Sequence, residues 1–446
     1  MSAVDTIADT GATGIKEERT PVTLYAAAML ALCVLVGATE GYDVQAMALA
    51  APLIRAAWHL GFNQVGMLLA VSAIGLVAGS FLLSPIGDGL GRRPAILIGL
   101  LIAGLGTGGS AFVPDMGWMV ATRLVAGIGL GLALPNVLAV AMELMPRRAH
   151  AFAVVLVSCG YPLGSAIGAA AASVLIPTHG WAAVFLVGGA GSAIALLVSA
   201  VFLPESPSFL ARRPAREAEL ARLLGRLGRA VPPQTLQRKV ERVEGIGERI
   251  AALFTPERRR ATALLWLISL GNVALVYFFF SWLPSLITAS GLPPEEALRA
   301  TSLFSVAGAI GALLMVFLMP RLGALRVMIV AYVAAIVVTA LLARPGDGAA
   351  FHVIIAIAGA SIIGSQFCLS AITAQYYPAA VRATASGFAA GIGRAGSILT
   401  PIVAGALIGA LGGGRQSFLI ALGPAGIALI AAILLELGGD LRRSRT

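Results

Sequence analysis

Apolar runs of about 20 residues recur along this sequence of 446 residues, and they constrain its fold more than any other feature. About 20 helical residues cross the hydrocarbon core of a bilayer, where every backbone amide must find its partner within the protein. Only 12% of the residues are charged, against about 25% in soluble domains. The pattern therefore predicts an all-α membrane protein with twelve transmembrane helices. The predicted spans lie near residues 24–54, 65–86, 94–113, 117–144, 150–176, 181–203, 261–289, 300–319, 325–343, 351–377, 384–410 and 416–438.

The spans form two sets of six with matching connections. The loop after the second span reads SPIGDGLGRRP and the loop after the eighth reads MPRLGALRV, so that Gly91 aligns with Gly323. Such a match indicates a parallel repeat, and transporters built this way hold their substrate near the membrane midplane between the repeats. We expect an N-terminal six-helix bundle at 1–203, a central cytoplasmic loop at 204–260, and a C-terminal six-helix bundle with a tail at 261–446.

Basic residues predict the orientation in the membrane. An even number of spans places both termini on one side, and the central segment on that side carries thirteen Lys and Arg between Arg212 and Arg260. Because basic loops stay in the cytoplasm, both termini are expected there. The central run ARRPAREAELARLLGRLGR has apolar residues at helical spacing, which favours short amphipathic helices on the membrane surface; a flexible linker is the alternative. The abundance of Ala, Gly and Arg is typical of a GC-rich bacterial genome. We therefore expect the protein in a bacterial inner membrane.

Several functional classes are excluded by placement and spacing. The net charge of +10 does not indicate a nucleic-acid partner, because the bases lie between apolar runs and no basic helix is interleaved with aromatic residues. No nucleophile–base arrangement predicts an enzyme, and no cofactor is expected apart from protons as a coupling ion. Metal and disulfide sites are not expected either, because the cysteines lie singly in apolar runs and the histidines near span ends. These residues are Cys33, Cys159, Cys368, His59, His150, His179 and His352.

Two carboxylates interrupt the first span, in the stretch GATEGYDVQAM. Glu40 and Asp43 share one helix face, and a charge at the bilayer centre costs about 2.5–3.5 kcal/mol on insertion scales. Counting along the fourth span places Arg123 at a similar depth, where it can offset part of the charge. The functional hypothesis is proton coupling, because desolvation favours a neutral carboxyl and a nearby arginine favours a charged one. An inert ion pair is the alternative, and the pattern does not tell which acid titrates.

Arg394 lies near the midplane of the eleventh span, and no acid in a span of the second half is an evident partner. A guanidinium in that position needs an anion, and the carboxylate of a substrate fits its fork. A pair with Asp43 or Glu40 across the halves, or packing against backbone carbonyls, is the alternative. Arg123 is the second candidate for binding the substrate anion.

The loop after the second span carries a candidate gate. Asp88 can cap the third span, while Arg92 and Arg93 can reach acids on other helices, such as Glu143 at the end of the fourth span. Together with Arg382, these residues are expected to tie the two bundles in an outward-facing state. Plain topology-setting charge is the alternative. Span 5 carries Gly160, Gly164 and Gly168 at the spacing that allows close helix contact.

These residues also carry a family resemblance that covers nearly the whole chain. DGLGRRP resembles the loop motif of the major facilitator superfamily, with Ser84 and Gly89 at two variant positions. RLVAGIGLG in span 4 and PESPSFL after span 6 are similar to further motifs of that superfamily. EGYD, SWLP and GIGRAGS resemble the aromatic acid:proton symporters in spans 1, 7 and 11.

The resemblance implies a proton-coupled transporter, acting as a monomer in the bilayer, that imports a benzoate- or hydroxybenzoate-type acid by alternating access. Alternatives are a carrier of another small organic anion, such as a dicarboxylate, and a membrane sensor that binds such acids without transport. An aromatic acid needs ring faces and a few hydrogen bonds. The candidates for lining its site are Tyr42, Asn136, Asn272, Tyr277, Trp282 and Gln366.

Overall fold

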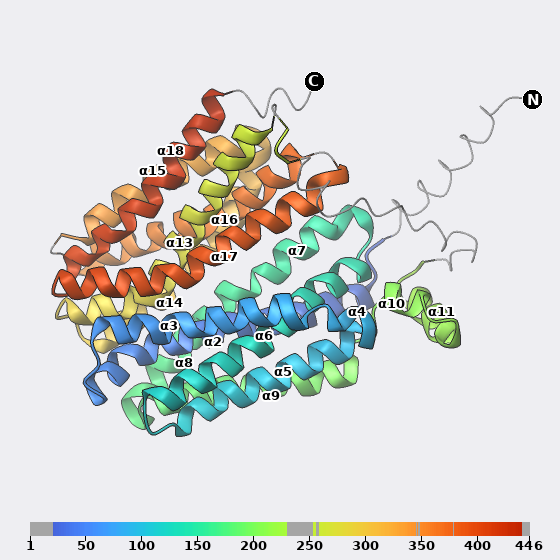
Figure 1. Ribbon diagram of the computed structural model, residues 1–446, viewed down its shortest axis with the longest axis horizontal. Helices are drawn as coiled ribbons and strands as arrows, with labels where there is room; N and C mark the ends of the chain where they lie inside the picture. The colour runs from blue at the N-terminus through green and yellow to red at the C-terminus, as the bar shows by residue number, and fades with distance from the viewer. Residues whose placement is uncertain are drawn as a thin grey trace, which may run out of the picture.

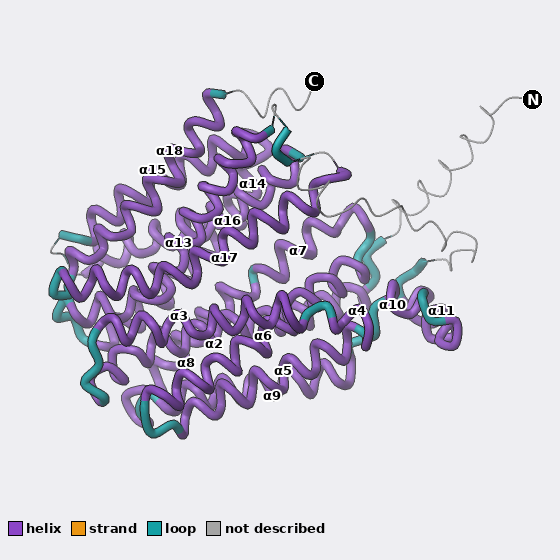
Figure 2. Tube along the Cα trace, viewed as in Figure 1, coloured by secondary structure: helices purple, strands orange, loops and turns teal. Residues whose placement is uncertain are grey.

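The computed structural model describes residues 21–229, 253–255, 258–344, 346, 348–377 and 379–438, without the side chains of residues 147, 151, 374, 375 and 379–384. Every regular element within these ranges is a helix (Figure 2). Twelve helical segments are long and apolar enough to cross a membrane, as the sequence predicts. They are Leu24–Ala57, Phe62–Leu83, Arg92–Phe112, Met116–Leu144, Phe152–His179, Ala182–Phe202, Arg259–Ala289, Pro294–Leu322, Ala324–Leu342, Gly348–Thr373, Ala385–Ala410 and Arg415–Leu437.

The helices form two bundles that lie side by side (Figure 1). The first comprises α2 (Leu24–Ala57), α3 (Phe62–Ala78), α5 (Arg92–Gly109), α6 (Met116–Leu144), α7 (His150–Ser158) with α8 (Gly160–His179), and α9 (Ala182–Phe202). The second comprises α13 (Arg259–Ala289), α14 (Pro294–Leu322), α15 (Ala324–Leu342), α16 (Gly348–Tyr376), α17 (Ala379–Ala410) and α18 (Leu422–Leu437). Short helices η1 (Gly79–Leu83), η2 (Ser110–Phe112) and η6 (Arg415–Ala421) extend α3, α5 and α18.

The repeat predicted from the loops has a structural counterpart. Gly91 and Gly323 each precede a span, α5 and α15 respectively, with φ angles of 112° and 87°. Both lie in the region of positive φ that side chains disfavour, so glycine serves the same turn in both halves. The alignment of Gly91 with Gly323 is therefore confirmed.

Among the described residues, the hydrophobic cluster shared by both halves lies at one end. We call the end where α2 begins and α18 ends the termini end. There, each half has its own hydrophobic cluster, one from Ala26 to Leu227 and one from Leu253 to Leu435. At the opposite end, one shared cluster combines the second part of α2, the start of α3, the second part of α13 and the end of α17. Figure 1 shows α3 beside α17 in this region. The structure is thus a state closed at the opposite end.

The central segment packs against the first bundle. It contains α10 (Pro207–Ala211), η4 (Pro214–Arg216) and α11 (Glu217–Arg226). The apolar face of α11, with Leu220, Leu223 and Leu224, is buried in the cluster formed by the first half at the termini end. The amphipathic helix is confirmed, but the expectation that its apolar face rests on lipid is wrong, because protein already covers that face. Residues 230–252 of this segment lie outside the described residues.

Glycines set the distance between α2 and α8. A Cβ added at Gly41 would overlap the backbone carbonyl of Tyr161, and one added at Gly164 would overlap that of Ala38. Small residues allow such backbone approach in membrane helices. Close contact is confirmed at Gly160 and Gly164, whereas at Gly168 the nearest atoms are side chains at ordinary distance. This contact places Tyr161 against the helix that carries Glu40.

Replacing Gly41 by Ala is expected to destabilise the protein by about 1–3 kcal/mol, because the new methyl group must push α8 away from α2. Gly191→Ala in α9 is the matched control, since nothing lies within 4 Å of a Cβ there. The control should be neutral or more stable by up to about 1 kcal/mol. Thermal melting of both purified variants checks this, and equal melting temperatures would contradict the close approach of α8.

Candidate functional site

Asp43 and Arg123 form a buried ion pair inside the first bundle. The Arg123 side chain is fully buried, and its guanidinium binds both carboxylate oxygens of Asp43, with the Nη1–Oδ1 distance at 2.9 Å. Its Nε donates to Ser72 Oγ at 3.1 Å, and Thr107 Oγ1 donates to the same carboxylate. Buried charges are tolerated when paired and hydrogen-bonded in this way. The pair therefore joins α2, α3, α5 and α6 into one unit.

This pairing corrects one expectation about Arg123. The sequence makes it a second candidate for binding the substrate carboxylate, yet its fork is already occupied by Asp43 and its side chain has no exposed surface. An additional anion would have to displace a carboxylate that accepts several hydrogen bonds. Arg123 thus neutralises Asp43. Glu40, the other acid of the first span, does not share this arginine.

Glu40 faces the second bundle instead. Its Oε1 lies 3.8 Å from Nη1 of Arg394 in α17, and the two side chains are 13% and 37% exposed. The partner of Arg394 is therefore an acid of the first half, which is the alternative left open by the sequence. This ion pair is long and partly exposed, in contrast with the tight, buried pair of Asp43. It connects α2 and α17, which belong to different bundles.

Two tyrosines lie near this cross-bundle ion pair. Tyr161 of α8 lies against two rings of α13, with centroids 6.5 Å from Tyr277 and 5.0 Å from Phe280. The hydroxyls of both tyrosines lie close enough to Glu40 and Arg394 to interact with their charges. Tyr277 thus lies near the ion pair, and its role in lining the substrate site stays a prediction. The sequence analysis does not single out Tyr161. Its position between the glycines of GYPLG indicates a close helix contact and could have identified it.

Two further lining candidates belong to a polar network in the second bundle. Asn272 is fully buried, donates to Gln366 and accepts from the hydroxyls of Tyr332 and Ser365. Every polar atom of Asn272 is used, so its role is to hold Gln366 in place. Gln366 is half-buried and lies on α16, facing α13.

Three other candidates lie away from the centre. The Tyr42 hydroxyl donates to the carbonyl of Val184 at 2.9 Å, so its ring points into the first bundle. Asn136 donates to the carbonyls of Ser84 and Leu132 near the termini end. Trp282 is fully buried, with its ring 6.3 Å from that of Phe62, where the halves close. In the described state these three side chains are buried or hydrogen-bonded within the protein, so their role in lining a substrate site stays a prediction.

The candidate gate is a network within the first half. Arg92 pairs with Glu143 as expected, and Glu143 also accepts from Ser206 and Ser208. Glu205, which the sequence does not single out, accepts from the backbone amides of Arg92 and Arg93 at 2.9 and 3.2 Å. A carboxylate at this position satisfies amides at the start of α5.

The expected roles of the other gate residues change accordingly. Asp88 lies in α4 (Ile86–Leu90), is 66% exposed and pairs, among the described residues, with Arg92 at 4.0 Å, so it does not cap α5. Arg93 donates to the carbonyl of Ala200. The described ties thus stay within one bundle and do not join the two, contrary to expectation. The side chain of Arg382 lies outside the described residues.

The described residues hold no cluster of three or more His, Cys, Asp or Glu that could bind a metal ion. Cys33, Cys159 and Cys368 are free and buried.

A pair of six-helix bundles with a charged centre between them is the architecture of a membrane transporter rather than an enzyme. The sequence profile of the Major Facilitator Superfamily matches residues 33–401. The chain therefore belongs to the major facilitator superfamily, as its motifs indicate.

Relatives cover almost all of the chain. The gallate transporter of Pseudomonas putida is 32% identical over 415 residues, which are 93% of this chain and 92% of that protein. The 4-hydroxybenzoate transporter PcaK of Acinetobacter baylyi is 31% identical over 434 residues, 94% and 92% of the two chains. The xylose transporter XylE from E. coli, solved in a partially occluded inward open conformation, superposes with a TM-score of 0.72 at 16% identity. That structure covers 93% of this chain and 97% of its own, and the likeness shows the fold.

Proposed function

We propose that this protein imports a single-ring aromatic carboxylate together with a proton, by alternating access. The observation that carries the proposal is the ion pair between Glu40 and Arg394, which links the two bundles amid tyrosine rings. The names of the relatives, a gallate transporter and a 4-hydroxybenzoate transporter, support an aromatic acid as cargo.

Charge balance explains how such a centre couples the acid to a proton. In the empty carrier, the carboxylate of Glu40 neutralises Arg394. An incoming substrate carboxylate takes over the fork of Arg394, which leaves Glu40 as an anion without a partner in a poorly solvated place. Glu40 then takes up a proton, and the centre is neutral again. The acid and the proton therefore bind together. The centre is neutral in the loaded carrier and in the empty carrier, the two forms that change their access from one side of the membrane to the other.

The rings around the centre define the substrate class. Tyr161 and Tyr277 are partly exposed and offer ring faces to a flat substrate, while the buried Phe280 supports the ring of Tyr161; edge-to-face or offset contacts between rings contribute about 0.5–1.5 kcal/mol each. The tyrosine hydroxyls and Gln366 supply the hydrogen bonds that a phenol substituent needs. A dicarboxylate would use the arginine but not the rings.

Alternating access uses the one-sided closure of the bundles. We place the protein in the bacterial inner membrane as a monomer, with the termini in the cytoplasm because the basic loops lie on that side. The state described above then faces inward. The unit around Asp43 and Arg123 moves with the first bundle, while Glu40 and Arg394 separate as α2 and α17 move apart.

The gate fits this movement as a property of the first bundle. Arg92, Glu143 and Glu205 hold the ends of α5 and α6 to the start of the central segment, so that this end moves as one body. Asp88 and Arg382 remain gating candidates, and the exposed carboxylate of Asp88 is available to the second bundle when the termini end closes.

Changing Arg394 tests the substrate site. Arg394→Lys keeps the charge but loses the two-pronged fork, so binding of 4-hydroxybenzoate should weaken by about 1–3 kcal/mol, roughly 5–150-fold. Binding to purified protein measures this, and the neutral methyl ester of the acid should bind both forms alike. If folded Arg394→Ala binds the acid as tightly as the wild type, the assignment is wrong.

A further inference from the structure

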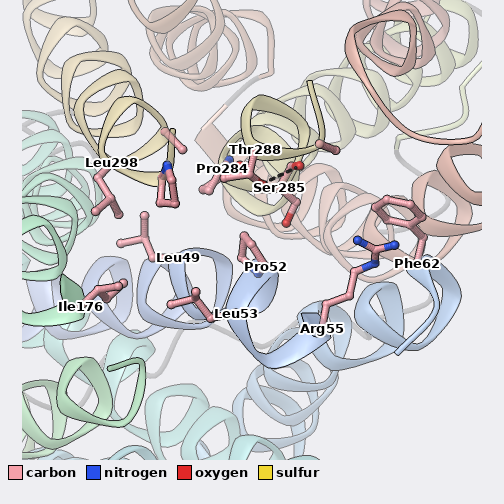
Figure 3. Close-up of a pocket in the computed structure, with 13 residues that line it drawn as sticks. Leu49, Pro52, Leu53, Arg55, Phe62, Ile176, Pro284, Ser285, Thr288 and Leu298 are labelled. Carbon is pink, nitrogen blue, oxygen red and sulfur yellow. Dashed lines mark hydrogen bonds between the residues drawn. The ribbon is translucent and has the colours of Figure 1, made fainter. Parts of the chain in front are cut away.

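A cavity of about 260 Å³ lies between the bundles at the end opposite the termini (Figure 3). Its walls come from α2 and the start of α3 in the first half, and from α13 and the start of α14 in the second. On α2 the lining residue nearest Glu40 is Leu49, which follows it by roughly 14 Å along the helix, and Arg55 follows Glu40 by roughly 22 Å. The cavity is thus distinct from the proposed substrate centre.

The residues that line the cavity include two with a buried polar atom that the described residues leave unsatisfied. Among the thirteen described residues that line it, Arg55 alone is charged. Its guanidinium lies over the ring of Phe62, 4.0 Å from the centroid, and its buried Nε finds no hydrogen-bond partner among the described residues. The Oγ of Ser285, a residue only 5% exposed, likewise finds none. Buried polar groups are normally satisfied, so both atoms indicate a ligand with acceptor oxygens.

The other walls define the rest of that ligand. Leu49, Leu53, Pro52, Pro284 and Leu298 make the cavity mostly apolar. Pockets for drug-sized ligands hold about 300–1,000 Å³, so a cavity slightly below that range suits a smaller molecule. An apolar body of one ring with a single carboxylate matches both the walls and the cation. Figure 3 shows Ser285 on the α13 side of the cavity and Arg55 on the α2 side, with the Arg55 guanidinium beside the ring of Phe62.

We propose that this cavity is a second binding site for a single-ring carboxylate, of the same chemical class as the cargo, an identity that rests on the proposed function. A molecule bound there touches α2 of one bundle and α13 and α14 of the other. It therefore stabilises the state closed at this end and slows its reopening, as any ligand does that binds one conformation better. High concentrations of the acid on this side inhibit transport of the acid itself.

Binding of radiolabelled 4-hydroxybenzoate to the full chain in nanodiscs tests the site. Wild-type protein should show two classes of site, and Arg55→Gln should weaken the lower-affinity class at least tenfold while leaving the other unchanged. Ser285→Ala, which keeps every charge, should weaken the same class by a smaller factor. Arg299→Gln removes an exposed arginine at the same end that does not line the cavity, and it should bind like the wild type.

Transport provides a second readout. In proteoliposomes, uptake by the wild type should fall at high acid concentration, and Arg55→Gln should relieve that inhibition. A single class of site in the wild type, or two classes that neither variant alters, would overturn the second site. If Arg394→Ala keeps the tighter class while Arg55→Gln loses the weaker one, the cavity stands and the central assignment falls. No binding of the acid by the wild type would overturn both.

Discussion

Glu40→Gln is expected to abolish accumulation of the acid against its gradient while leaving exchange of the acid across the membrane intact. Gln is neutral at every pH, so it mimics the protonated state of the loaded carrier but leaves Arg394 without a counterion in the empty one. An uncompensated arginine at the membrane centre costs about 2.5–3.5 kcal/mol on insertion scales. Return of the empty carrier should therefore be disfavoured on the order of 100-fold. Exchange uses only the loaded carrier, which remains neutral.

Labelled 4-hydroxybenzoate in proteoliposomes measures both activities, with an imposed pH gradient for accumulation and with preloaded acid for exchange. Glu436→Gln is the matched control, because this acid pairs with Arg326 at the surface of the termini end and should not affect coupling. Accumulation driven by the pH gradient in Glu40→Gln would place the proton site elsewhere. The same result would remove the charge-balance argument, since Arg394 would not depend on Glu40.

The fold is largely predictable from the sequence because the bilayer imposes simple rules. Span length follows from its thickness, and the loop glycines Gly91 and Gly323 mark the same turn in both repeats. The division into residues 1–203, 204–260 and 261–446 rests on the same reasoning. The surface that covers the apolar face of α11 depends on tertiary packing. The sequence pattern favours the membrane surface, whereas in the structure the face packs against the first bundle.

The sequence predicts which charged residues form the site, but it does not predict which acid pairs with which arginine. Residue depth alone brings Glu40, Asp43 and Arg123 together, but two acids on one helix face can each meet the same arginine. The rotation of α2, fixed by contacts such as Gly41 against α8, decides that Asp43 takes Arg123 and Glu40 takes Arg394. The same rotation turns Tyr42 away from the centre.

Long-range contacts explain the remaining differences. Asp88 precedes α5 by a few residues and so attracts the prediction of a cap, whereas Glu205 reaches those amides from 113 residues away in the chain. Arg55 shows no function in the sequence beyond marking one side of the membrane. Its role becomes visible only when α13 and α14 close a cavity over it.

The second large effect separates the two acids of the first span. Asp43→Asn is expected to destabilise the protein by about 3–5 kcal/mol, because it leaves the fully buried charge of Arg123 without its partner. Glu40→Gln is the matched comparison and should lose clearly less stability than Asp43→Asn, since Arg394 is 37% exposed in the described state whereas Arg123 is fully buried. Thermal melting of the purified variants measures the difference.

A compensating double variant distinguishes a structural pair from a proton site. Asp43→Leu combined with Arg123→Met removes both charges at similar volume, and replacing a buried ion pair in this way is often neutral or stabilising. The double variant should therefore melt well above Asp43→Asn. If Asp43→Asn instead melts like the wild type but loses accumulation while keeping exchange, then Asp43 carries the coupled proton. Glu40 would in that case serve only to neutralise Arg394 in the empty carrier.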